Sequence, residues 1–173
     1  GSGDPCHLSN NNDPDNGIYK NASLCTGDTF YLWDEPDTQG YSYEWAGRTW
    51  FEYSQRFPTQ LQALRASGTK ITSPMLKAGG SGVLQANLEA FLGGCGDACT
   101  TPNDPAYIDV IAVTAFCGDF NLNGCRGGAT FIYNESVGMS NAHGNLPVYI
   151  TNWSRLQTSN PNDQLEAIDA IDA

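Results

Sequence analysis

The feature that most constrains this chain is a regular alternation of short apolar runs with longer segments of helical pattern. The runs typical of β-strands lie at 29–33, 70–76, 107–116 and 146–153. The segments that predict helices lie at 44–66, 82–94, 127–144 (a short helix) and 161–173. The order is therefore β-α-β-α-β-α-β-α, which implies parallel strands joined by crossover helices.

Local signals refine these predicted elements. Pro58 lies inside the first helical segment and should divide or bend it, because proline removes a backbone donor. The run at 107–116 is nearly all apolar, which is typical of a strand covered on both faces. In the last segment Leu165, Ile168 and Ile171 fall on one face of the predicted helix.

Two architectures fit such an alternation, an open doubly wound sheet and a (β/α)8 barrel. The chain contains no G-x-G-x-x-G or G-x-x-x-x-G-K-[ST] motif, so a nucleotide-binding open sheet has no support. A barrel needs about eight βα units and roughly 250 residues, whereas this chain offers four units in 173 residues. Residues 1–27 are rich in Asn, Asp and Gly and predict an irregular segment, so the α/β domain is expected at 28–173.

The six cysteines and three glycosylation sequons indicate an extracellular, secreted protein. The favoured disulfides are Cys6–Cys25, Cys95–Cys99 and Cys117–Cys125, each local in sequence, although six cysteines allow fifteen pairings. Zinc is the alternative, but it needs tight C-x-x-C pairs or histidines nearby, and the chain has only two histidines. The sequons begin at Asn21, Asn134 and Asn152, and both kinds of feature are typical of secreted chains.

The acidic charge balance limits the partners. Net charge is −11 and the isoelectric point is about 4.2, so the surface repels nucleic-acid phosphates and anionic lipid. The apolar runs are too short to cross a bilayer. Neutral polysaccharides, cations and other proteins remain open as partners.

Five motifs in one order carry a family resemblance. They are YLWDEPD, KITSPML, LEAFLGGC, IDVIAVTAF and PVYITNW, within about Thr29 to Trp153. This ordered set resembles glycoside hydrolase family 128, the endo-β-1,3-glucanase-like proteins of the glycosyl-hydrolase catalytic-core superfamily. Family members carry strands that end in Asn-Glu-Pro-Asp, in Ser-Pro, in a His-Trp-Tyr motif and in a Thr-Glu-Phe motif.

The resemblance implies a (β/α)8 barrel in which the four strand-like runs are strands 4 to 7. Strands 1 to 3 and strand 8 have no counterpart in this sequence. The expected fold is therefore a partial TIM-barrel-like α/β unit with about four βα units, parallel strands and disulfide-stabilised loops. Half a parallel barrel would expose strand edges and core, so further segments of the same polypeptide or other copies are expected to complete it.

The resemblance also implies the site residues. Glu35 matches the acid/base glutamate, and Asp34 replaces the asparagine that precedes it in the family. Asn152 stands where the family has its nucleophilic glutamate, and Thr114 replaces the histidine after strand 6. Retaining glycosidases need two carboxyl groups about 5 Å apart, so the loss of one predicts a catalytically degenerate site.

Several further residues are weaker candidates for the site. Sugar-stacking aromatics are expected at or just after the strand ends, and they are Trp33, Tyr41, Tyr43, Trp45 and Trp153. Asp37, Glu44 or Asp119 could supply a second acid, with Asp119 as the base of an inverting mechanism. The stretch DFNLNG offers Asp119, Asn121 and Asn123 as the first half of a calcium loop, but Thr130 stands where the closing acid is required. We therefore expect no cofactor.

The sequence thus predicts an extracellular glycoside-hydrolase-like domain that binds β-glucan or serves structurally in a wall, matrix or filament. The alternative is an active endo-β-1,3-glucanase that uses Glu35 with a non-standard second carboxylate. A third possibility is a purely structural protein–protein module.

Overall fold

The protein has a parallel α/β fold. The computed structural model describes residues 29–30, 32, 35–116 and 124–154. The strands are β1 (Thr29–Phe30), β2 (Lys70–Ile71), β3 (Leu76–Lys77), β4 (Ile111–Phe116) and β5 (Val148–Ser154). The helices are η2 (Pro36–Gln39), α2 (Tyr43–Arg56), α3 (Pro58–Ala66), α4 (Val83–Cys95), η3 (Gly96–Cys99) and α5 (Gly124–Ala142), of which η2 and η3 are 3-10 turns.

Every strand pairing among the described residues is parallel, as the alternating pattern predicts. β1 pairs with β2, and β3, β4 and β5 form a sheet in that order. A single bridge between Thr72 and Val110 joins the end of β2 to the start of β4. β2 and β3 thus lie end to end along β4, as two parts of one broken strand. The presence of a partial α/β unit is confirmed, whereas closure into a barrel is not part of the described structure.

The predicted strand at 70–76 is divided into β2 and β3. Ser73 and Pro74 lie between the two pieces. The Ser73 hydroxyl accepts a hydrogen bond from the backbone of Ala112 at 3.0 Å, and its own backbone N–H donates to Val110 at 2.9 Å. Pro74 has no N–H to continue the ladder, so the strand breaks there and resumes two residues later.

Local signals determine the boundaries of α2 and α3. Ser42 caps α2 by accepting a hydrogen bond from the Trp45 backbone at 3.0 Å. Helix α2 ends before Phe57 and α3 begins at Pro58, so the predicted division at this proline is confirmed. Helix α5 is 19 residues long, and the expectation of a short helix in this region is wrong.

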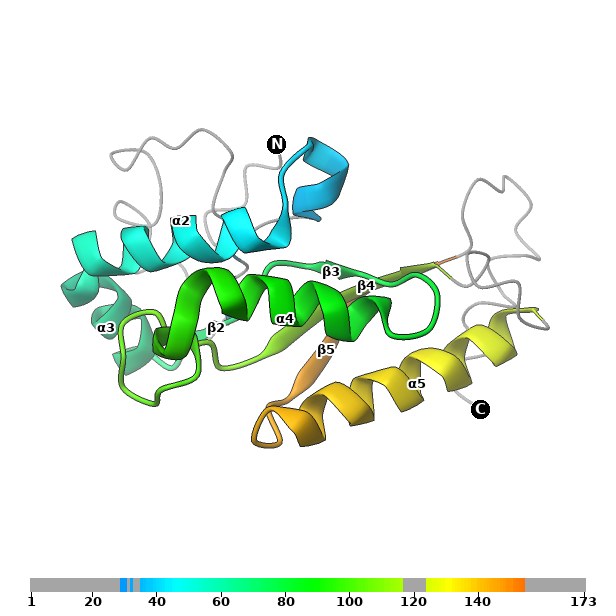
Figure 1. The fold of residues 1–173 in the computed structure, drawn as a ribbon. Coiled ribbons are helices and arrows are strands. Elements are labelled where there is room, and N and C mark those ends of the chain that lie inside the picture. Colours follow the sequence, from blue (N-terminus) through cyan, green and yellow to red (C-terminus); the bar gives the residue numbers. More distant parts are fainter. Residues whose placement is uncertain (1–28, 31, 33–34, 117–123, 155–173) are drawn as a thin grey trace.

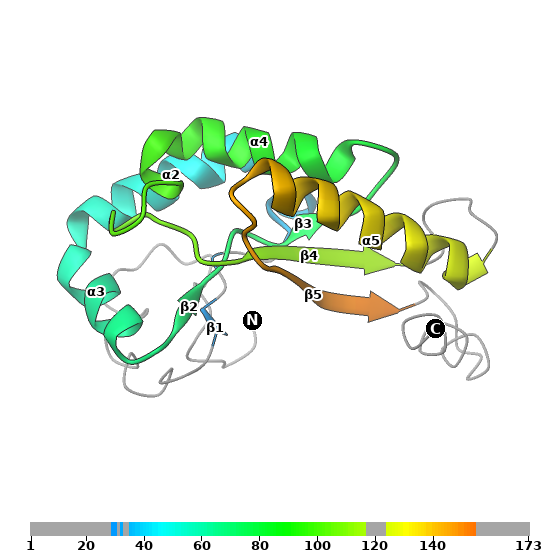
Figure 2. The ribbon, with the colours of Figure 1, turned by 90° about the horizontal axis from the view of Figure 1, so that it is seen from below.

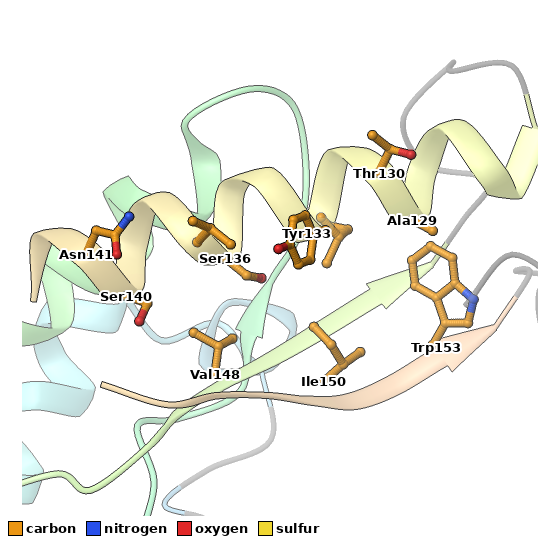
Figure 3. A pocket seen from close by; sticks show the side chains of 11 residues that line it. Ala129, Thr130, Tyr133, Ser136, Ser140, Asn141, Val148, Ile150 and Trp153 are labelled. Atoms are coloured by element: carbon orange, nitrogen blue, oxygen red, sulfur yellow. The ribbon is translucent and has the colours of Figure 1, made fainter. Parts of the chain in front are cut away.

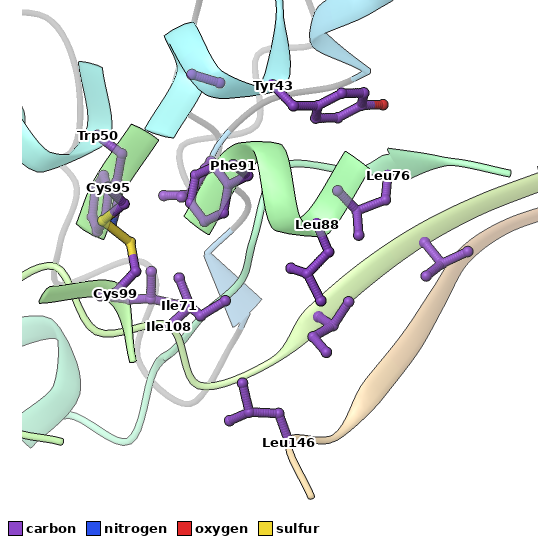
Figure 4. Packing of buried hydrophobic residues seen from close by; sticks show 14 of the residues in the cluster. Tyr43, Trp50, Ile71, Leu76, Leu88, Phe91, Cys95, Cys99, Ile108 and Leu146 are labelled. Atoms are coloured by element: carbon purple, nitrogen blue, oxygen red, sulfur yellow. A yellow bond between two sulfur atoms is a disulfide. The ribbon is translucent and has the colours of Figure 1, made fainter. Parts of the chain in front are cut away.

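Helices α4 and α5 lie side by side on one face of the β3-β4-β5 sheet, and α2 packs on α4 (Figures 1 and 2). The core lies between these helices and the sheet, and Trp50, Leu88, Phe91 and Ile108 are completely buried in it (Figure 4). The Trp50 indole N–H donates to the Ala106 carbonyl at 2.7 Å. This bond satisfies the one polar atom of a large buried side chain.

The central strand β4 is covered on both sides, as its composition predicts. Residues 111–115 are all buried. Ile111, Val113 and Ala115 belong to the core cluster beneath the helices, whereas Ala112 and Thr114 alternate with them and so face the opposite side.

One predicted disulfide is confirmed in full. Cys95 and Cys99 are bonded and link the end of α4 to η3. Cys125 is also in a disulfide, and its expected partner, Cys117, lies outside the described residues. Cys6 and Cys25 lie outside them as well.

Candidate functional site

Glu35 lies in the tight loop between β1 and the 3-10 turn η2. Its side chain is half-buried, and its backbone has a φ of 20°, which is uncommon for a residue other than glycine. The Glu35 carbonyl accepts hydrogen bonds from the Thr38 backbone at 3.1 Å and from the Thr38 hydroxyl at 2.8 Å. Pro36, which follows, is buried. These hydrogen bonds therefore hold the backbone of Glu35 in a defined conformation between β1 and η2.

Tyr43 ties this loop to β3. Its hydroxyl accepts a hydrogen bond from the Lys77 backbone at 2.9 Å and lies 3.1 Å from a carboxylate oxygen of Asp37. It also lies 3.3 Å from the Met75 carbonyl. Because one hydroxyl proton serves two acceptors, Tyr43 donates to either Asp37 or Met75.

Burial raises the pKa of Tyr43 well above its usual value, and the negative charges of Asp37 and Glu35 add to this rise. The hydrogen bond from Lys77 acts in the opposite direction but does not cancel it. Since Glu35 acts electrostatically on Tyr43, two of the predicted site residues lie in one neighbourhood. Tyr43 remains a neutral anchor of the loop at ordinary pH.

Thr114 and Asn152 form a second neighbourhood, because they are direct register partners on β4 and β5. Thr114 is buried and Asn152 is exposed. Between them, the Thr151 hydroxyl donates to the Val113 carbonyl at 3.0 Å and lies 3.3 Å from the Thr114 hydroxyl. The resemblance names Thr114 and Asn152 separately, and the sheet register brings them together.

A β-bulge determines which way these side chains point. Val113 pairs with Ile150 but Thr114 pairs with Asn152, so Thr151 is an extra residue in β5. Val148, Ile150 and Trp153 consequently share the side that faces α5, and Asn152 points to the opposite side with Thr114. Without the bulge, strict alternation would turn Asn152 toward the helix.

Trp153 packs against α5. Its ring is partly buried beside Ala129 and the cluster around Cys125. It therefore lies on the helix side of the sheet, on the other side from Thr114 and Asn152. Asp34 and Trp33, also expected to contact sugar, lie outside the described residues.

The Thr114–Asn152 pair defines what this part of the site can do chemically. The exposed Asn152 carboxamide can donate hydrogen bonds to sugar hydroxyls and accept them, whereas the Thr114 hydroxyl is buried beside Thr151. Neither side chain carries a carboxylate group, so neither can attack an anomeric carbon to form a glycosyl ester. Glu35 supplies an ionisable group at the predicted acid/base position. Asn152, at the predicted nucleophile position, does not.

An apolar groove of about 870 Å³ lies between α5 and β5 (Figure 3). Tyr133, Val137, Val148, Ile150 and Trp153 supply its apolar surface. Tyr133 is 69% exposed and Ile150 is 44% exposed. None of the motifs named in the sequence indicates this groove. The apolar pair Tyr133 and Val137, one helical turn apart, is the signal that could have indicated it.

Only some of the predicted glycosylation and metal sites lie among the described residues. Asn134 and Asn152 are both exposed, on α5 and β5 respectively, whereas Asn21 and the calcium-loop residues Asp119, Asn121 and Asn123 lie outside the described residues. Within the described ranges, no cluster of three or more His, Cys, Asp or Glu side chains could hold a metal ion. None of the helices in the same ranges combines the length and apolarity needed to cross a membrane.

Comparison with known proteins gave no match to any family model, curated protein or solved structure.

Proposed function

We propose that this chain is an extracellular glycoside-hydrolase-like domain that has lost catalysis and binds β-glucan, or uses the scaffold structurally in a wall, matrix or filament. The observation that carries the proposal is the register pairing of Thr114 with Asn152. Both positions correspond to polar site positions in the family that the sequence resembles, and neither provides a carboxylate. A site that keeps hydrogen-bonding groups but lacks the nucleophile is suited to binding without cleavage.

The strand order supports a barrel segment as the scaffold. β1 pairs in parallel with β2, and β4 pairs in parallel with β3 and β5. The bridge from Thr72 to Val110 sets β2 beside β4 as well, so β2 and β3 act as two parts of one broken strand. A doubly wound sheet reverses its strand order at a switch point, and no such reversal occurs among the described strands. Glu35, which follows β1, and Asn152, near the carboxyl end of β5, lie where barrels carry their sites.

The groove between α5 and β5 supports a further part of the proposal, that additional polypeptide covers this side of the domain. The occupant that we propose is a second copy of this chain, in line with the expectation that other copies complete the fold. The exposed apolar side chains of Tyr133 and Ile150 are the surface that it would cover.

The decisive experiment measures both cleavage and binding on the full chain. We expect no new reducing ends when the protein is incubated with laminarin, a soluble β-1,3-glucan, and we expect laminarin to retard the protein in affinity electrophoresis. Turnover that is abolished by Glu35→Gln would overturn the loss of catalysis and establish the active glucanase instead. Absence of both turnover and retardation would overturn glucan binding and leave the structural role.

A further inference from the structure

Two aromatic rings are stacked at the end of the Glu35 loop. The centroids of Tyr41 and Trp45 lie 4.3 Å apart and the two ring planes differ by 19°. Tyr41 is 47% exposed, and Trp45 is partly buried against the hydrophobic core. The outer ring is therefore a flat apolar surface that is supported from behind by a second ring.

Hydrogen bonds fix the backbone on both sides of this ring pair. The Tyr41 N–H donates to the Pro36 carbonyl at 3.0 Å, which closes the turn that begins at Glu35. Gly40 has a φ of 82° and donates to the Asp37 carbonyl at 3.2 Å. Ser42 then caps α2 through the Trp45 N–H. Because the backbone is already ordered, a ligand that binds to Tyr41 loses little affinity to the ordering of the protein.

The other described aromatic candidates have different roles in the fold. The Tyr43 side chain is only 5% exposed and its hydroxyl is hydrogen-bonded to the β3 backbone. Trp153 lines the groove beside α5, on the opposite side of the sheet from Asn152. The Tyr41–Trp45 pair combines an exposed ring, a flat support and a place next to η2, the turn that follows Glu35.

We propose that Tyr41, supported by Trp45, is a stacking platform for one pyranose ring of a β-glucan chain. The inference rests on the proposed glucan-binding function and assigns it a residue. A pyranose has an apolar face of C–H groups that can lie flat on an aromatic ring, while its hydroxyls remain in water. The tyrosine hydroxyl is not needed for this contact, since the ring face supplies it. The contact involves no charge and should be insensitive to salt.

The test compares laminarin binding by full-chain variants in affinity electrophoresis. We expect Tyr41→Ala and Tyr41→Leu to weaken binding about 3- to 10-fold, which is the range that one aromatic contact supplies. Tyr41→Phe should bind within about twofold of the wild type because it keeps the ring. Tyr133→Ala, which removes an exposed tyrosine from α5, is the matched control and should also bind like the wild type. The leucine variant keeps apolar bulk at position 41 and removes only the aromatic ring, and thermal unfolding confirms that each variant is folded.

Three outcomes would overturn the platform. If the wild type binds laminarin and both Tyr41→Ala and Tyr41→Leu bind equally well, the platform is wrong and glucan binding stands. If Tyr133→Ala weakens binding as much as Tyr41→Ala, the contact is not specific to this loop. If the wild type itself does not bind, the proposed glucan binding fails and the platform fails with it.

Discussion

Replacing Gly94 by alanine tests how closely α2 and α4 pack. A Cβ atom on Gly94 would lie 2.0 Å from the Glu44 carbonyl oxygen and 3.0 Å from the Arg48 backbone nitrogen. The reverse contact is equally close, since a Cβ on Gly47 would lie 2.0 Å from the Phe91 carbonyl oxygen. The two helices therefore touch backbone to backbone, and no flexible side chain can move aside to make room.

The change that Gly94→Ala causes in the free energy of unfolding follows from two opposing effects. A methyl group at Gly94 forces the helices apart, and overpacking of this kind costs about 1–3 kcal/mol. Alanine gains at most about 1 kcal/mol over glycine through its helix propensity, and less near a helix end. Because separation also disturbs the buried contacts of Trp50 and Phe91, we expect Gly94→Ala to lower the free energy of unfolding by about 2 kcal/mol.

Gly93 is the matched control, because it is the preceding residue of the same helix and a Cβ there would meet nothing within 4 Å. We expect Gly93→Ala to leave stability unchanged or to raise it by up to about 0.5 kcal/mol. Urea unfolding followed by circular dichroism, without reductant, measures both variants. If Gly94→Ala is as stable as the wild type, or if the two variants shift equally, the close helix contact is refuted.

Two further predictions concern the loop anchor and the groove. Tyr43→Phe should cost about 1–2 kcal/mol at pH 7, because the Lys77 backbone N–H loses its acceptor. Since burial raises the pKa of folded Tyr43 above its unfolded value near 10, its stabilising contribution is complete below pH 10 and lost above it. The stability difference between wild type and Tyr43→Phe should therefore shrink as pH rises beyond 10, and a constant difference up to pH 11.5 would contradict this account. Ile150→Asp should lower the free energy of unfolding by about 2 kcal/mol or more if chain covers the groove, whereas Phe51→Asp on α2, 38% exposed, should lower it by only about 1 kcal/mol. If Ile150→Asp and Phe51→Asp lower stability by the same small amount, nothing covers the groove. If Ile150→Asp dissociates a dimer, the occupant of the groove is a second copy of the chain.

Much of the local structure could be predicted from the sequence, because local signals determine it. Pro58 separates two helices whatever their tertiary packing, because the lack of its backbone N–H interrupts helical hydrogen bonding locally. The nearly all-apolar run around Val113 is typical of a strand covered on both sides. Cys95 and Cys99 are close enough in the chain to meet without help from the rest of the fold. The length of α5 was underestimated because glycines inside it weaken the helical signal.

The arrangement of the candidate site depended on contacts between distant segments. Glu35 and Asn152 could be named from short motifs, but the pairing of Asn152 with Thr114 depends on the register of two strands. The bulge at Thr151 then decides that Asn152 faces away from α5 and that Trp153 faces toward it. A single extra residue reverses every later side chain of a strand, and no pattern in β5 alone indicates it.

The sequence by itself therefore determined the alternation of elements, their parallel connection and the absence of a carboxylate at position 152. These depend on composition and on spacing along the chain. Only the tertiary structure decided the backbone contact between Gly47 and Gly94, the groove beside α5 and the stacking of Tyr41 on Trp45. Each of these depends on how two surfaces approach in space, and that distance is set by the packing of the whole core rather than by neighbouring residues.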